Sequence, residues 1–227
     1  MRRTSGAITP VVIAALLAAH TATAAVGCTL NDPDRDIARI FPDAVGYETE
    51  FLSIAEHGAD SLAAGIEARL GDALDPVYET IDVPYAYYTI LGPGGAILGR
   101  VHGVNQRGTY GGMQIILATD PRGVIIDFYY QKLSSPEAAR FRDQAFTGSF
   151  RGLSIRDFER ESPDRRREVV DVRQRPLDDI ADPSEKSAED FKATLRGITK
   201  SLILLDEFHG IGGPPPGKEE TNEENHR

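Results

Sequence analysis

The chain has 227 residues, of which 41% are hydrophobic and 26% charged, and its formal net charge at pH 7 is −10. This length and composition indicate a globular chain of one domain and exclude a largely disordered one. An acidic surface repels phosphate backbones, and the one basic cluster, Arg165-Arg166-Arg167, is flanked by acids, so we expect no nucleic acid partner.

The N-terminus has the layout of a secretory leader. A basic start precedes an apolar run over residues 11–19, which is too short to span a membrane, and small residues follow. Ala25-Val26-Gly27 then leads to Cys28, the only cysteine, in an order that resembles the lipobox of bacterial lipoproteins. We therefore predict a lipoprotein-type signal peptide over residues 1–27 and a lipid anchor on Cys28. The alternative is cleavage after Ala22-Thr23-Ala24, with Cys28 left as an ordinary thiol.

The first predicted elements after the leader are a helix, a strand and a second helix. Asn31-Asp32-Pro33 caps a short helix, and Pro42 stops it. Alternating residues over 47–54 predict an edge strand. The second helix begins near Asp60, carries apolar residues on one face, and ends at Gly71.

Two β-hairpins follow. Strand-like segments over 85–91 and 96–104 are joined by a Gly-Pro-Gly-Gly turn, and residues 105–108 link them to the second hairpin. Its apolar runs, 113–118 and 124–130, flank a turn in which Pro and Gly supply the required backbone angles. Because all these links are short, the sheet should be an antiparallel meander of at least four strands.

The rest of the chain is predicted to cover this sheet. Ser135-Pro136-Glu137 starts a helix that continues to about Phe146, and an apolar run over 169–172 adds an edge strand. The strongest helical pattern runs over 187–208, and Gly197 is the position at which it can divide in two. The predicted fold is therefore α+β: an antiparallel sheet of hairpins with helices packed on it and a closing C-terminal helix.

The second hairpin is entered through Thr109-Tyr110-Gly111-Gly112-Met113 and left through Ser134-Ser135-Pro136-Glu137. With these flanking motifs, the segment from Gly108 to Phe141 resembles the FMN-binding domain of extracytoplasmic subunits in the RNF and sodium-pumping NADH:quinone oxidoreductase complexes. The first strand of the family's hairpin follows Gly-Tyr-Gly-Gly-Pro, which corresponds here to Thr109-Tyr110-Gly111-Gly112-Met113. Its second strand is followed by Glu-Thr-Pro-Gly, which corresponds to Ser134-Ser135-Pro136-Glu137. The turn chemistry is kept in part, while the family's acid and its last Gly are missing.

The family attaches FMN through its phosphate to a Thr in a Ser-Gly-Ala-Thr motif that opens the final helix. The nearest sequence here is Arg196-Gly197-Ile198-Thr199, so Thr199 is the attachment candidate, provided that the helix begins afresh near Gly197. Ser184-Glu185-Lys186-Ser187 is a second candidate; in the alternative, Thr199 is a surface helix residue and Ser187 an N-cap. The resemblance implies cofactor contacts, covalent or not, from Tyr110, Gly111, Gly112, Ser135, Pro136, Gly197 and Thr199.

The resemblance also implies a function in extracytoplasmic electron transfer, as an electron carrier beside a membrane redox complex rather than as an independent enzyme. We divide the chain into a signal peptide (1–27), an N-terminal arm (28–46), an FMN-binding-like domain (47–208) and a disordered tail (209–227). The alternative function is a cofactor-free lipoprotein that uses a degenerate FMN-binding fold as an interaction or assembly module. The incomplete attachment motif favours this alternative.

Overall fold

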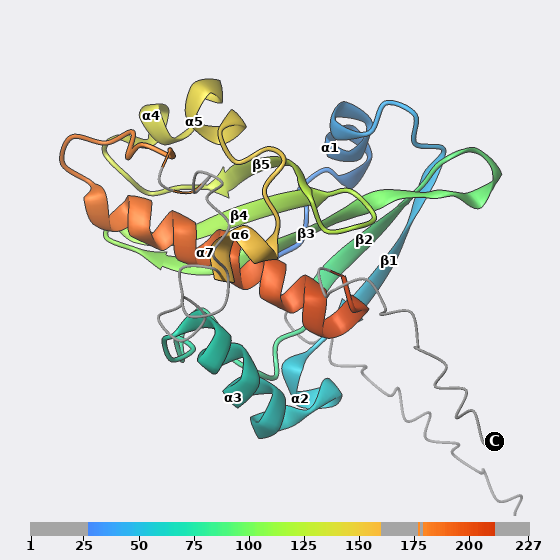
Figure 1. Cartoon of the computed structure of the whole chain (residues 1–227), viewed down its shortest axis with the longest axis horizontal. Coiled ribbons are helices and arrows are strands. Elements are labelled where there is room, and N and C mark those ends of the chain that lie inside the picture. Colours follow the sequence, from blue (N-terminus) through green and yellow to red (C-terminus); the bar gives the residue numbers. More distant parts are fainter. Residues whose placement is uncertain (1–26, 160–176, 178, 212–227) are drawn as a thin grey trace, which may run out of the picture.

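The structure is a computed structural model that describes residues 27–159, 177 and 179–211. Five strands form one antiparallel sheet in the order β1-β2-β3-β4-β5, so every strand pairs with its neighbour in sequence (Figure 1). The predicted α+β meander is confirmed. The strands are β1 (Gly46–Leu52), β2 (Tyr85–Leu91), β3 (Ile97–Gly108), β4 (Gly111–Thr119) and β5 (Ile125–Lys132). The helices are α1 (Pro33–Ile40), α2 (Ile54–His57), α3 (Ala59–Leu70), α4 (Ala138–Phe141), α5 (Gln144–Gly148), α6 (Ile155–Glu159) and α7 (Ala188–His209), with a 3₁₀ turn η1 (Pro93–Gly95).

β3 is longer than its apolar run predicts, and only two residues separate it from β4. The predicted link over 105–108 is part of the strand because its polar side chains find partners on both faces of the sheet. Asn105 donates to the carbonyl of Gly27 on one face, and Gln106 is buried against α7 on the other. Gly111 closes the tight turn with a φ of 132°, a region that L-residues rarely adopt.

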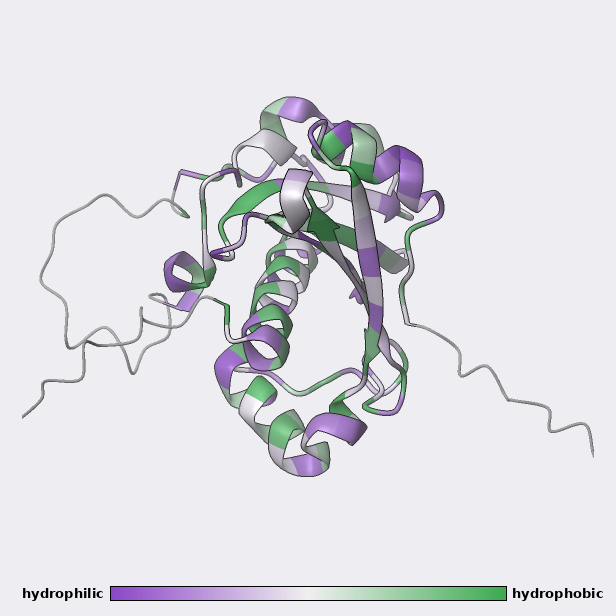
Figure 2. Cartoon of the chain, turned by 90° about the vertical axis from the view of Figure 1, so that its right-hand side faces the viewer, coloured by the Kyte–Doolittle hydropathy of each residue, from purple (hydrophilic) through white to green (hydrophobic). Residues whose placement is uncertain are grey.

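α7 is one unbroken helix of 22 residues that lies across one face of the sheet (Figure 1). A Cβ atom at Gly197 would lie 2.5 Å from Cδ1 of Ile115, so the glycine allows the helix to approach β4 closely. The packing gained offsets the roughly 1 kcal/mol that glycine costs inside a helix. The helix therefore does not divide at Gly197, a possibility on which the attachment of FMN to Thr199 depended. Figure 2 shows alternating hydrophobic and hydrophilic segments along α7, typical of a helix with one buried face.

The single helix predicted from Ser135 to about Phe146 is wrong, because two short helices, α4 and α5, occupy this stretch. Asp143 breaks it: its backbone is extended, with ψ 135°, and its side chain accepts the N–H of Ala145 at 2.8 Å as the N-cap of α5. The break turns the rings of Phe141 and Phe146 towards each other in the core, with 5.8 Å between their centroids.

The other face of the sheet is covered by α1 and by the chain that leads to it. Cys28, Leu30, Ile37 and Phe41 form a second core there with the sheet, separate from the core beneath α7. Among the described residues, no helix is long and apolar enough to cross a membrane. The predicted leader, the edge strand over 169–172 and the tail beyond residue 211 lie outside the described residues.

Candidate functional site

Three segments singled out by the resemblance meet at one end of the sheet. A Cβ atom at Gly111 would lie 3.6 Å from Cβ of Ser134, so the β3–β4 turn touches the loop that leaves β5. In the same turn, the N–H of Thr109 donates at 2.8 Å to Asp190 in the first turn of α7. The fold thus brings together Tyr110, Gly111, Ser135 and Pro136, four of the predicted cofactor contacts.

Glu137 ties the loop after β5 to the chain that leads into α7. Its two carboxylate oxygens accept the N–H groups of Glu185 at 3.0 Å and Lys186 at 2.9 Å, two consecutive donors just before the helix. These bonds lower the pKa of Glu137, and the Ser187 hydroxyl and Arg140 lower it further. At neutral pH, a negative charge of the chain itself therefore occupies the place where α7 begins.

The other predicted contacts lie elsewhere. Thr199 is inside α7, and its hydroxyl donates to the carbonyl of Leu195 at 2.8 Å. The backbone N–H groups around it belong to an unbroken helix, so none is available to a phosphate. Gly197 faces Ile115 in the core, and Gly112 is covered by the ring of Tyr78, whose Cε1 would be 2.6 Å from an added Cβ. This geometry matches the alternative in which Thr199 is an ordinary helix residue.

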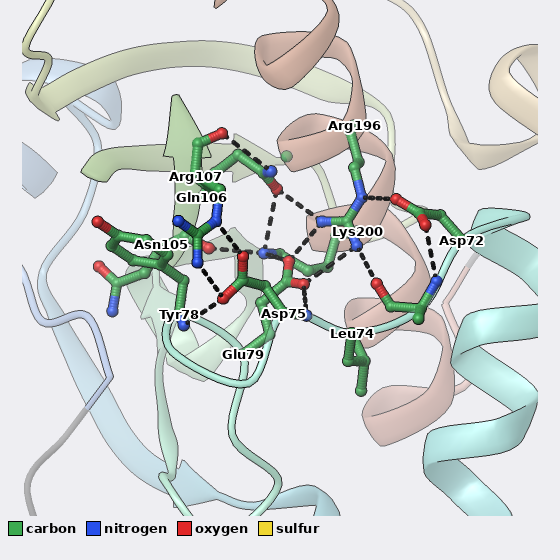
Figure 3. A network of polar contacts seen from close by, with 12 residues as sticks. Asp72, Leu74, Asp75, Tyr78, Glu79, Asn105, Gln106, Arg107, Arg196 and Lys200 are labelled. Atoms are coloured by element: carbon green, nitrogen blue, oxygen red, sulfur yellow. Dashed lines mark hydrogen bonds and ion pairs between the residues drawn. The ribbon is translucent and has the colours of Figure 1, made fainter. Parts of the chain in front are cut away.

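Next to this region lies an ion cluster that the sequence analysis missed (Figure 3). Arg196 donates to both carboxylate oxygens of Glu79, at 2.6 Å and 3.0 Å. The ammonium of Lys200 also contacts Glu79, and donates to the carbonyl of Asn105 at 2.6 Å. Glu79 is 2% exposed and Lys200 is 0% exposed. The cluster therefore pins the loop before β2 to α7 and β3.

Burial and neighbouring charges shift the pKa values of Lys200 and Glu79 in opposite directions. Burial lowers the pKa of Lys200 to about 8, although the carboxylate of Glu79 partly restores it. Burial alone would raise the pKa of Glu79, but the hydrogen bonds and charges of Arg196 and Lys200 outweigh burial. The pKa of Glu79 is therefore below its ordinary value. Arg196 and Lys200 are four residues apart on one helix, and this spacing was the one feature of the sequence that could have indicated the cluster. Glu79 lies 117 residues from Arg196, so nothing local could identify it.

A cavity of about 570 Å³ opens beside the cluster, between α7 and the loop that follows α3. Each cation that lines it is already paired: Arg107 with Asp75, Lys192 with Glu189, and Arg196 with Asp72. No aromatic ring lines this cavity. A flavin needs a cation or free N–H groups for its phosphate and an apolar wall for its ring, so the lining fits FMN poorly.

The predicted lipidation site is part of the core. Cys28 is 2% exposed, and a Cβ atom at Gly103 would lie 2.6 Å from its sulfur. The arm around it is fastened to the sheet at both ends: the N–H of Gly27 donates to the carbonyl of Pro84 at 3.0 Å, and that of Asn31 to Gln131 at 2.8 Å. A diacylglyceryl group on this sulfur would have to displace the arm. Acylation stays a prediction, and the packed thiol favours the alternative cleavage upstream.

We expect the thiol of Cys28 to be present and unreactive in the folded protein. Burial raises its pKa to about 12, which lowers the thiolate fraction at neutral pH about a thousandfold. An aromatic disulfide reagent should label it at once in denaturant and very slowly in buffer. Rapid labelling of the native protein, or a mature mass that includes a diacylglyceryl group, would contradict this expectation.

Comparison of the sequence with protein-family models and with curated proteins gave no match. In the part of the chain that the structure describes, no three metal-binding side chains come together.

Proposed function

We propose that this protein is an extracytoplasmic interaction module with an FMN-binding-like fold that carries no flavin. The observation that supports this most directly is the Glu137 carboxylate bonded to the two N–H groups before α7. In the family that the sequence resembles, the start of the final helix carries the FMN phosphate. Here an internal anion takes that place, and the Thr199 hydroxyl is engaged inside the helix.

The proposed location rests on the leader-like N-terminus. The buried thiol of Cys28 supports the form in which the leader is cleaved after Ala24 and no lipid is attached at this sulfur. The folded arm from Gly27 to Asn31 then stays on the sheet in the mature protein. The form with a lipid anchor on Cys28 requires that the arm leave its place.

A flavin carrier for a membrane redox complex is the second candidate. The convergence of the Tyr110–Gly112 turn, the Ser135-Pro136 loop and the start of α7 favours it. In this case FMN would be held without a covalent bond, and the redox chemistry would come from the cofactor. Bound flavin would then require Glu137 to move away from Glu185 and Lys186.

The visible absorption spectrum of the protein, purified from its native host or from cells that also make a flavin transferase, distinguishes the two candidates. We expect a colourless protein that takes up no FMN at micromolar concentration. The same sample is then precipitated with acid, and the colour of the pellet and of the supernatant is compared. Yellow colour in the pellet would indicate covalent flavin, and yellow colour in the supernatant would indicate bound but unattached FMN. Either result would refute the cofactor-free module.

A further inference from the structure

Polar groups without a partner gather under the C-terminal end of α7. In the part of the chain that the structure describes, seven buried side-chain nitrogen and oxygen atoms lack a hydrogen-bond partner. Five of them lie in this one region, which we name the Arg100 patch: Tyr87 Oη, Arg100 Nε, His102 Nδ1, Thr119 Oγ1 and His209 Nε2. Because nearly all buried polar groups in proteins are hydrogen-bonded, five unpaired groups in one place need a common explanation. A ligand that bonds to them would supply it.

The register of the sheet places these groups side by side on the face that α7 covers. Arg100 and Thr119 are direct partners on β3 and β4, and Tyr87 and His102 are direct partners on β2 and β3. Arg100 and His102 are two residues apart on one strand, a distance of about 7 Å. His209 is the last residue of α7, and the centroid of its ring is 4.8 Å from that of Tyr87. The five groups are therefore close enough to contact one small molecule.

Arg100 is the member of the patch that most needs an external partner. The chain has 35 acidic residues against 25 Lys and Arg, yet none of the acids that the structure describes forms an ion pair with this half-buried guanidinium. A charge that loses solvent without gaining a counter-charge is costly. Since part of Arg100 is still exposed, the patch is in contact with solvent, from which an anion can enter.

The hydrogen-bonding capacity of the patch defines the ligand. Arg100, Thr119 and Tyr87 each have an N–H or O–H group to donate, so the ligand must supply acceptor oxygens. His102 has the opposite need. Its Nε2 lies 3.0 Å from the carbonyl of Ser201, which can only accept, so Nε2 carries the proton and Nδ1 is left with a lone pair. A small carboxylate that also has a hydroxyl group meets both needs.

We propose that the Arg100 patch binds a small hydroxycarboxylate, with the carboxylate at Arg100 and Thr119 and the hydroxyl at His102. Glu50 lies on the same face of the sheet, with its carboxylate 3.5 Å from Nε2 of His209, so a monoanion is favoured over a doubly charged phosphate. This inference is independent of the proposed function, which concerns the start of α7 and not its end. Its test can succeed or fail whether or not the protein contains flavin.

The test measures the thermal midpoint of the wild type in sodium lactate, sodium propionate and sodium chloride at equal ionic strength. We expect a midpoint that rises with lactate concentration and saturates, because a ligand that binds only the folded state stabilises it by mass action. Propionate has the charge of lactate without its hydroxyl, so it should bind about threefold more weakly or worse. Arg100→Gln should abolish the response to lactate. Arg122→Gln is the matched control, since it removes an exposed arginine that is already paired with Asp120, and its response should equal that of the wild type.

Thr119→Val is the second variant, which decides the matter if Arg100→Gln does not fold. Valine is similar in shape to threonine and removes a buried hydroxyl that has no partner, so we expect the variant to fold and to bind lactate about tenfold more weakly. Titration calorimetry with lactate gives the dissociation constant of each protein. The proposal is overturned if the wild type shows no saturable response, which would mean that water alone satisfies these groups. Equal binding of lactate and propionate, or unchanged binding of lactate by Arg100→Gln or Thr119→Val, would also overturn it.

Discussion

Replacing Glu79 with alanine should lower the free energy of unfolding by about 3–5 kcal/mol, because it removes the shared carboxylate of a buried ion cluster. Lys200, which is 0% exposed, would then lose its counter-charge and lie beside Arg196, which would keep only the exposed Asp72. A buried cation that has lost both its solvent and its partner is far more costly than the net stabilisation of the intact pair. Urea unfolding at pH 7.5 of the wild type and Glu79→Ala measures the difference.

Two other variants of the same cluster serve as controls. Lys200→Met should cost less than Glu79→Ala, because Arg196 still pairs with the carboxylate of Glu79. Asp72→Ala should change the free energy of unfolding by about 0.5 kcal/mol, as expected for an exposed ion pair, since the Asp72 side chain is 65% exposed. If Glu79→Ala is no more destabilising than Asp72→Ala, the cluster does not hold the loop before β2 in place.

Acidification from pH 7.5 to pH 5 should destabilise the protein, with about 2 kcal/mol of the loss due to His102 alone. His102 is completely buried: its ring stacks on Tyr87 with centroids 4.8 Å apart, and its Nε2 lies 3.0 Å from the carbonyl of Ser201 on α7. Burial lowers its pKa to about 3 in the folded protein, against 6.5 for an ordinary histidine. At pH 5, His102 is therefore protonated in the unfolded chain and neutral in the folded protein. The stability linked to His102 is complete above about pH 6.5 and is lost as the pH falls towards 3.

His102→Leu isolates this effect. The variant should be less stable at pH 7.5, but its loss of stability between pH 7.5 and pH 5 should be about 2 kcal/mol smaller than that of the wild type. Part of the slope should remain, because burial also lowers the pKa of His209, to about 4. His57→Gln is the control for loss of a less buried histidine near the same end of α7. An unchanged pH slope in His102→Leu would show that His102 is hydrated or already protonated in the folded state.

The local sequence pattern was sufficient to predict most of the secondary structure and the order of the strands. The Gly and Pro turns and the apolar runs around them define each hairpin within about twenty residues, and short links permit only antiparallel neighbours. The stripe over 187–208 likewise predicts α7 from its own spacing. The errors arose where a local preference competed with packing. Asp143 breaks a helix so that two phenylalanines meet, and Gly197 is accommodated by close contact with β4.

The site depends on pairs that are far apart in the chain. Glu79 and Lys200 are 121 residues apart, and Glu137 meets Glu185 across 48 residues. A charged residue in isolation is expected to be solvated, and only the tertiary structure decides which charges are buried and which partner they face. Cys28 illustrates the same limit: its position after a leader predicts a lipid anchor, and the fold places its sulfur against Gly103.

The sequence by itself therefore determined the α+β class, the order of the hairpins and the closing helix, because these follow from the period of hydrophobic residues and the chemistry of turns. Only the tertiary structure decided that α7 is unbroken, that Thr199 lies inside it, and that Glu137 occupies the N–H groups before it. The physical reason is that the N–H groups of Glu185 and Lys186, which precede the N-cap of α7, bond to whichever acceptor the fold brings to them. Here that acceptor comes from the chain itself.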